Sequence, residues 1–232
     1  MLGKFINHCE DSLTAAVFTH LLHLPTEVFW QILCNACYTD KLHKLPKSPG
    51  DPRSIDFWPN WDPEGTDNSD RVIPDLFIRF VSFDLIIESK RWDTDMQNPK
   101  QWINEMTAYD NEYGNEKIPV RMIALGGIWD TKDEVVTLKS NSCHVHMCKW
   151  ARVLDECKRM RKELERLKYP TSQTQAHVRT LTHLIDLFAW HGFQTGEWFA
   201  DLVANAQLVR LVSSNASHHK ALQRMSIQLK NS

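Results

Sequence analysis

Two runs of alternating apolar and polar residues meet at Val81 and Ser82 and predict a β-hairpin within residues 71–92. A turn centred there opposes apolar residues on one face, in the pairs Leu76–Ile87, Ile78–Leu85 and Phe80–Phe83. The other face carries the pairs Asp75–Glu88, Phe77–Ile86 and Arg79–Asp84. Because a shift of one residue would move the apolar set to the opposite face, the pattern fixes this register and predicts that the apolar face is buried.

The remaining chain divides into helical and extended segments by the same criterion. Apolar residues at helical spacing predict helices over residues 10–24, 28–42, 100–113, 150–168, 175–212 and 218–229. Strands are predicted at residues 54–58, 118–129, 135–138 and 144–148. The stretch 118–129 is nearly continuously apolar, which indicates a central strand. This order predicts an α/β/α sandwich around a mixed sheet of four to five strands, with a C-terminal helical extension.

Composition limits the cellular compartments and the kinds of partner that we expect for this protein. The chain of 232 residues has a net charge of −2 and a sequence pI near 6.6, which argues against coating nucleic acid through overall positive charge. It contains no apolar run long enough to span a bilayer, and its six cysteines lack the spacing of a disulfide framework. These features predict a cytoplasmic protein without a membrane partner.

The hairpin carries three groups that suit hydrolysis. Side chains alternate along a strand, so Lys90 projects from the same face as Glu88, and Asp75 lies opposite Glu88. Two converging carboxylates repel each other unless a cation lies between them, and a hard ion such as Mg²⁺ suits oxygen ligands. A lysine beside the ion can orient or help deprotonate water and offset charge in a phosphoryl transition state. The alternative is an ion pair of Glu88 with Lys90 at an exposed sheet end.

Pro74-Asp75 followed by Glu88-Ser89-Lys90 resembles the signature of the PD-(D/E)XK, or restriction-endonuclease-like, nuclease superfamily. The resemblance implies that Asp75, Glu88 and the Ser89 carbonyl hold Mg²⁺, for which Mn²⁺ can substitute. It implies that Lys90 is the catalytic residue that prepares the attacking water.

The resemblance covers residues 8–168 and implies a nuclease core in residues 1–170, on which residues 171–232 pack as an extension. It implies a hydrolase that cleaves nucleic acid, DNA in preference to RNA, in a setting such as bacterial defence. Two other functions remain open: a non-catalytic subunit of nuclease fold that binds nucleic acid or assembles a complex, and a zinc-stabilised interaction module.

The same resemblance suggests three further site residues. Many members carry a glutamate on the first helix that reaches the metal, and Glu10 occupies that place; the alternative is a carboxylate that stabilises the helix start. One branch has Gln followed four residues later by Tyr near the substrate. Gln101 fits this pattern, but Glu105 stands at the tyrosine position and Tyr109 comes one turn later. Gln101 and Tyr109 are therefore the predicted substrate-binding residues.

Two cysteine-rich segments raise the question of zinc, and they contain Cys34, Cys37, Cys143, His144, His146 and Cys148. Four of these side chains could bind structural Zn²⁺. Their spacing matches no standard finger or ribbon, and alternation along a strand lets only part of the second segment converge. Core cysteines are therefore the favoured interpretation, and structural Zn²⁺ is the lesser alternative.

Three other segments bear on substrate and partners. Basic residues in 152–168 could contact phosphates, but acidic residues lie between them at salt-bridging distances, which favours a solvated helix face. The acidic loop 62–70 leads into the hairpin and is predicted to border the cleft and to order only when substrate binds. The C-terminal helices could mediate a homodimer or a larger complex.

Overall fold

The computed structural model describes residues 10–39, 44–91, 96–138 and 142–194. Its helices are α1 (Glu10–Leu21), α2 (Thr26–Ala36), α3 (Pro99–Tyr113), α4 (Trp150–Glu165) and α5 (Ser172–Trp190), and a 3₁₀ turn, η2 (Gly114–Glu116), follows α3. Its strands are β1 (Cys37–Tyr38), β2 (Ser54–Phe57), β3 (Leu76–Arg79), β4 (Asp84–Ser89), β5 (Val120–Leu125), β6 (Glu134–Thr137) and β7 (Ser142–Cys148). None of the helices in the described ranges is long and apolar enough to cross a membrane.

The hairpin of β3 and β4 has the predicted register. Every Cα pair between the two strands is the predicted one, and the Phe80 amide donates to the Phe83 carbonyl across the turn at 3.0 Å. The predicted cross-strand ion pair is present, with Arg79 Nε 3.3 Å from an Asp84 oxygen. The alternation predicted one buried face, whereas both faces of β4 are buried. The second face is covered because α3 and the loop before the hairpin pack against it.

The sheet is mixed and open, with the strand order β1-β7-β5-β4-β3-β2 and with β6 also paired to β7. β3 pairs antiparallel with both β2 and β4, and β4, β5 and β7 run parallel. β1 and β6 pair with different parts of the same edge of β7. The sheet therefore has seven strands instead of the predicted four to five. Of these seven, β1 lies in a segment that the sequence pattern predicted as helix.

The second predicted helix, residues 28–42, ends early. α2 stops at Ala36, and Cys37 has the extended backbone angles φ −67° and ψ 147°. Cys37 then pairs with Cys148 as part of β1. This segment is extended although its sequence pattern is helical, because it pairs with the edge of β7. Pairing with a sheet edge satisfies the backbone groups that the helix leaves unpaired.

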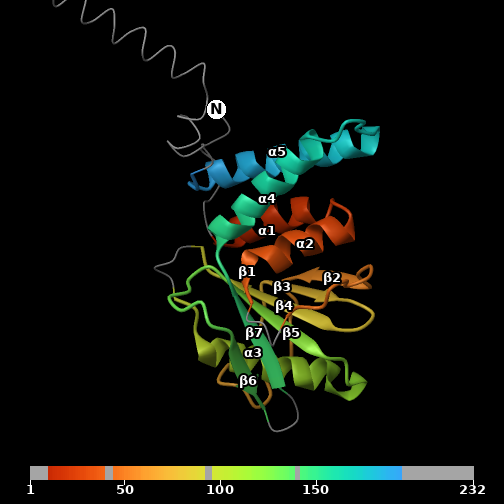
Figure 1. The fold of residues 1–232 in the computed structure, drawn as a ribbon. Coiled ribbons are helices and arrows are strands. Elements are labelled where there is room, and N and C mark those ends of the chain that lie inside the picture. Colours follow the sequence, from red (N-terminus) through yellow and green to blue (C-terminus); the bar gives the residue numbers. More distant parts are fainter. Residues whose placement is uncertain (1–9, 40–43, 92–95, 139–141, 195–232) are drawn as a thin grey trace, which may run out of the picture. The chain divides into compact units, whose positions relative to one another are not determined.

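Helices cover both faces of the sheet (Figure 1). On one face, α1, α2, α4 and α5 pack on a core that includes Phe18, Trp30, Ile87, Val153 and Phe188. On the other face, α3 and the loop before the hairpin cover a second core that includes Trp61, Phe77, Ile86, Met106 and Met122. This arrangement confirms the predicted α/β class.

The helix α5 belongs to the same compact unit as the elements before it, and that unit extends to Phe193. Leu181, Leu184 and Phe188 of α5 are fully buried in the first core. The domain boundary predicted at residue 170 therefore falls inside this unit, between α4 and α5. The helix predicted at residues 218–229 lies outside the described residues.

The acidic loop before the hairpin is held against α3 by the chain's own hydrogen bonds. The Asn111 side chain donates to the carbonyls of Asp62 and Glu64 at 3.0 and 2.9 Å, respectively. The Asp62 amide donates to Glu112 at 2.9 Å. These bonds position the loop against α3.

Candidate active site

Polar side chains from several elements meet at one end of the sheet. Glu10 begins α1, Asp75 immediately precedes β3, Glu88 and Ser89 end β4, and Lys90 follows. The side chains of Asp75, Glu88 and Ser89 are buried, and α3 lies beside them. Asp75 and Glu88 are the residues next to the last paired positions of the hairpin, Leu76 and Ile87, and the charge of Asp75 contributes to the raised pKa of Glu88.

Asp75 is oriented by the residue that follows Glu88. Its Oδ2 accepts hydrogen bonds from the Ser89 amide at 2.8 Å and from the Ser89 hydroxyl at 2.7 Å. Thr14 of α1 stands behind Ser89, with 2.6 Å between the two hydroxyl oxygens. Burial raises the pKa of Asp75, and the hydrogen bonds from Ser89 oppose that rise. The carboxylate is thereby held in one orientation.

Glu88 and Lys90 form an ion pair in the buried part of the site, with Nζ 2.6 Å from Oε1. The Gln101 side-chain amide donates to the same Glu88 oxygen at 2.6 Å. Burial, and then the charge of Asp75, raises the pKa of Glu88 to about 7. Burial lowers the pKa of Lys90, but the charges of Glu88 and Glu10 outweigh it, so the net pKa lies above the ordinary value. Lys90 is therefore a cation at neutral pH.

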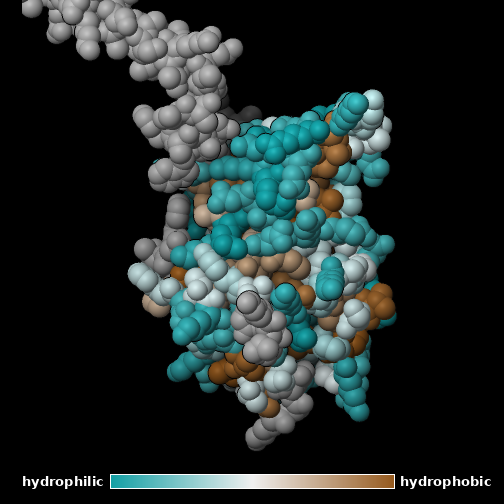
Figure 2. All heavy atoms as spheres, viewed as in Figure 1, coloured by the Kyte–Doolittle hydropathy of each residue, from teal (hydrophilic) through white to brown (hydrophobic). Residues whose placement is uncertain are grey.

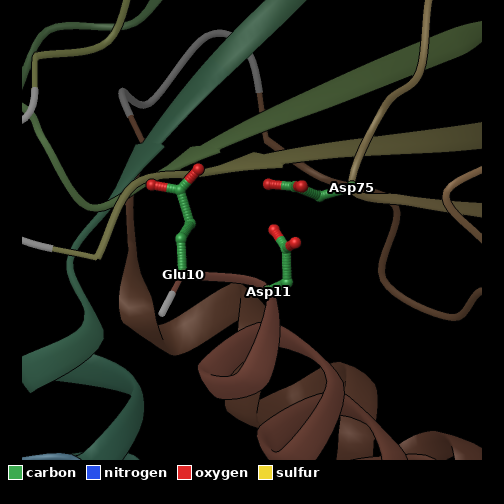
Figure 3. A group of neighbouring side chains, drawn as sticks. All are labelled: Glu10, Asp11 and Asp75. Carbon is green, nitrogen blue, oxygen red and sulfur yellow. The ribbon is translucent and has the colours of Figure 1, made fainter. Parts of the chain in front are cut away.

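Glu10 reaches the site from the first turn of α1, as predicted. One of its oxygens lies 3.4 Å from Lys90 Nζ, and the other accepts a hydrogen bond from the Arg91 amide at 3.1 Å. Asp11, for which no site role was predicted, also faces Asp75. One carboxylate oxygen from each of Glu10, Asp11 and Asp75 lies within 4.8 Å of the other two (Figure 3).

Glu105 of α3 is a second acid that was not predicted. Its side chain is 1% exposed, and neither of its carboxyl oxygens has a hydrogen-bond partner among the described residues. Burial, and then the charge of Glu88, raises the pKa of Glu105 well above its ordinary value. The signal that could have found it is its spacing, one turn after Gln101 on the same helix face.

Gln97 holds the ends of β4 and β5 together beneath these side chains. Its amide group donates to the Glu88 carbonyl at 3.1 Å and to the Leu125 carbonyl at 3.5 Å. Its oxygen accepts a hydrogen bond from the Trp102 indole at 3.0 Å. These bonds fix the backbone that presents Glu88 and Lys90.

Tyr109 does not lie at this site, in contrast to the prediction. Its ring is buried and its hydroxyl donates to Asp84 at 2.9 Å, at the opposite end of β4 from Glu88. It packs edge-on against Phe77 and Trp61. Eight residues of α-helix rise by about 12 Å, which carries Tyr109 away from Gln101. Tyr109 is therefore a core residue that satisfies Asp84 and not a substrate-binding residue.

The cysteines are distributed through the two cores. Cys37 and Cys148 are paired across β1 and β7, whereas Cys143 belongs to the second core. His146 Nδ1 lies 3.0 Å from a carboxylate oxygen of Asp133. In the described part of the chain, the His, Cys, Asp and Glu side chains close enough to share an ion are the acidic ones at the start of α1 and before β3. The two cysteine segments do not converge as a set of three ligands.

The basic residues of α4 are largely paired within the helix. The pairs are Lys158–Asp155, Arg159–Glu156, Arg159–Glu163 and Arg161–Glu165. Hydrophilic side chains dominate the visible surface over α4 and α5 (Figure 2). This surface fits the solvated helix face that the charge pattern favoured.

The donor set of the site suits a hard divalent cation. Carboxylate oxygens of Glu10, Asp11 and Asp75 gather there, and the Glu88 carboxylate at the end of β4 is buried. Oxygen donors that carry negative charge are the ligands that Mg²⁺ and Mn²⁺ prefer. A cation would also relieve the repulsion between Asp75 and Glu88. The residues present therefore fit a Mg²⁺ ion.

No protein-family model matches the chain. The chain is 26% identical over 205 residues to an uncharacterized protein of Pasteurella multocida (strain Pm70), and the match covers 84% of this chain and 75% of that protein. Among solved structures, it is similar to a chain in the half-complex from the tetradecameric assembly of Thermococcus gammatolerans McrB AAA+ hexamers with bound McrC. That match has a TM-score of 0.28 and 11% identity, and it covers 68% of this chain and 32% of that chain. The chain thus corresponds to about a third of the length of that solved chain.

Proposed function

We propose that the protein is a metal-dependent nuclease that hydrolyses phosphodiester bonds of DNA in preference to RNA, built on a restriction-endonuclease-like core. The observation that carries the proposal is the convergence of buried Asp75 and Glu88 with the Lys90 ammonium, 2.6 Å from Glu88. Support comes from the P-D and E-x-K signature, because the observed hairpin register is the one that joins its two halves. The preference for DNA follows from the family resemblance.

The chain's own residues would hold Mg²⁺ at this position. Asp75, Glu88 and the Ser89 carbonyl are the proposed ligands, and Glu10 and Asp11 each place a carboxylate oxygen within 4.8 Å of an Asp75 oxygen. Bound Mg²⁺ supplies a more acidic water and offsets negative charge on the phosphate. The protein contributes fixed donors, because Ser89 orients Asp75 and Gln101 orients Glu88.

Lys90 acts in this proposal as a positioned cation. Its pKa lies above the ordinary value because the charges of Glu88 and Glu10 outweigh the effect of burial, so it does not accept the proton of water at neutral pH. An ammonium has three N–H donors, and contacts to Glu88 and Glu10 engage two. The third can orient the attacking water or face a phosphate oxygen where charge develops.

Cleavage assays with the full chain test the proposal. Single-stranded DNA, duplex DNA and RNA are each incubated with Mg²⁺, with Mn²⁺ or with EDTA. We expect cleavage of DNA with either metal, none with EDTA, and loss of cleavage in Asp75→Ala and Lys90→Ala. Arg166→Ala, past the end of α4, is the matched control and should cleave normally. Equal cleavage by all variants would contradict the proposed site, and a wild type that binds but cuts no substrate would favour a non-catalytic binding subunit.

A further inference from the structure

A polar groove of about 520 Å³ opens beside the candidate active site, between the start of α3 and residues 67–73. Its lining includes Gln101 and Glu105, the two α3 residues that face Glu88. Its size falls within the range of about 300–1,000 Å³ that ligand sites occupy. The groove and the proposed catalytic site therefore share one wall.

The groove is lined by amide side chains, by the cations Arg71 and Lys100, and by two acids, of which Asp67 is exposed and Glu105 is buried. The amide side chains are those of Asn68, Asn98, Gln101 and Asn104. Lys100 is exposed, and within the ranges that the structure describes its ammonium has no ion-pair partner. Arg71 pairs with Asp70 at 3.0 Å, but the two side chains are 49% and 78% exposed. Such an exposed pair contributes little free energy, so Arg71 can exchange it for another anion.

The wall opposite α3 is shaped before any ligand contacts it. Asn104 accepts a hydrogen bond from the Asp67 amide at 3.3 Å, and its own amide group lies 3.5 Å from the Asn68 oxygen. Asn68 in turn donates to the Arg71 carbonyl at 2.9 Å. These bonds tie the segment that carries Arg71 to the helix that carries Lys100, so the two cations stand on opposite walls of a fixed groove.

We propose that this groove binds the DNA strand that flanks the scissile phosphate, with Arg71 and Lys100 contacting its backbone phosphates. The inference rests on the proposed nuclease function and adds the path of the substrate. Gln101 contacts Glu88 and also lines the groove, so a strand with one phosphate at Lys90 that leaves past Gln101 meets Arg71 and Lys100. The amides can donate to and accept from base edges, which adds polar contacts along the strand.

The charge distribution favours this path over the other basic surface. The proposed catalytic end is rich in carboxylates, which repel a polyanion that is not neutralised nearby. The α4 arginines are engaged by glutamates of their own helix, whereas Arg71 and Lys100 lie directly beside the site. Each cation that neutralises a phosphate releases counterions, so its contribution can be read from the salt dependence of binding.

Binding without cleavage separates this inference from the proposed function. Fluorescence anisotropy measures the affinity of the full chain for a short labelled DNA duplex and for one of its single strands. Ca²⁺ replaces Mg²⁺, and the measurement is repeated over a series of salt concentrations. We expect Arg71→Ala/Lys100→Ala to bind at least one of these about tenfold to a hundredfold more weakly near 0.1 M salt, with a salt slope smaller by roughly 2. Arg166→Ala/Lys168→Ala, an equal loss of charge at the end of α4, should change neither quantity.

The variant Arg71→Gln/Lys100→Gln keeps side-chain bulk and should reproduce the loss, which excludes misfolding as its cause. Equal affinity and slope for wild type and both groove variants would overturn the groove assignment even if the wild type cleaves DNA. A wild type that binds neither labelled DNA would overturn it as well. A specific loss in the groove variants supports the assignment even if no cleavage is found.

Discussion

The Ser89 side chain links two elements of the candidate site. It donates to Asp75 through its hydroxyl at 2.7 Å and contacts the Thr14 hydroxyl of α1 at 2.6 Å. Because Ser89 is fully buried, neither neighbour can replace the hydroxyl with bulk water. The orientation of Asp75 thus depends on a side chain that is not itself a proposed metal ligand.

Replacing Ser89 tests this dependence. We expect Ser89→Ala to lower the free energy of unfolding by about 1–3 kcal/mol, because buried partners lose a hydrogen bond to a charged group. Urea denaturation measures the change. Ser82→Ala, in the exposed turn of the same hairpin, is the control and should stay near the wild-type value. Equal stability of the two variants would show that the Ser89 hydroxyl does not support Asp75.

The acidic cluster should couple metal binding to stability. A ligand that binds only the folded state adds about 2.7 kcal/mol when present at a hundred times its Kd. We therefore expect Mg²⁺ to raise the melting temperature of the wild type and to leave that of Asp75→Asn almost unchanged. Differential scanning fluorimetry with and without EDTA gives the comparison. A shift of the same size in both proteins would place the ion elsewhere.

At the residue scale, the sequence predicts the site residues whose positions depend on the hairpin register or on a single helix. It misses the site residues whose positions depend on how the helices pack on the sheet. Glu10 and Gln101, which the family resemblance suggested, lie at the site. Asp11 and Glu105 join them only because the ends of α1 and α3 approach the sheet at particular angles. Helix spacing alone could not exclude Tyr109, because it ignores the rise along the axis.

At the scale of elements, the sequence predicts best the strands in which apolar and polar residues alternate regularly. The β3–β4 register follows from it, since a slip of one residue would expose the apolar face. The edge strand β1 cannot be read in this way. Its residues continue a helical pattern, and they become extended only because the edge of β7 is available.

Asp133, which precedes the edge strand β6, contacts the buried His146 of β7. This contact should make the stability of the protein depend on pH. Burial lowers the pKa of His146 below 6.5, against the opposing charge of Asp133. Below pH 6.5 the unfolded chain therefore takes up a proton that the folded protein does not, so stability falls as the pH falls. Urea denaturation at pH 7 and at pH 5 measures the free energy of unfolding. We expect this free energy to fall less between the two pH values in His146→Gln than in the control His183→Gln, which changes an exposed histidine. Identical slopes would contradict this.

At the scale of the whole molecule, α5 packs on the core, as predicted for the extension that begins at residue 171, and it lies in the same compact unit as α4. Its residues Leu181, Leu184 and Phe188 fill the core formed with α1 and α4. The composition break near Tyr169 and Pro170 predicted a boundary there, but a break in the chain marks a turn as readily as the end of a domain. Only the packing of α5 distinguishes the two.

Two truncated chains test this assignment. A chain that ends at Phe193 should melt cooperatively near the wild-type temperature. A chain that ends at Pro170 loses three buried side chains worth roughly 2–5 kcal/mol each, which approaches the total stability of about 5–15 kcal/mol. We expect the shorter chain to be unfolded by circular dichroism. A shorter chain as stable as the longer one would make α5 a separate element.

We propose that Lys90, held by Glu88 at 2.6 Å, is the catalytic cation of a metal-dependent nuclease. The most direct test is the single-turnover rate of DNA cleavage by Lys90→Ala at saturating Mg²⁺, relative to wild type. Loss of one positioned donor should slow the reaction by about 10²–10³-fold, while Mg²⁺ still raises the melting temperature of the variant. A variant that cleaves within a few-fold of the wild-type rate would contradict the claim.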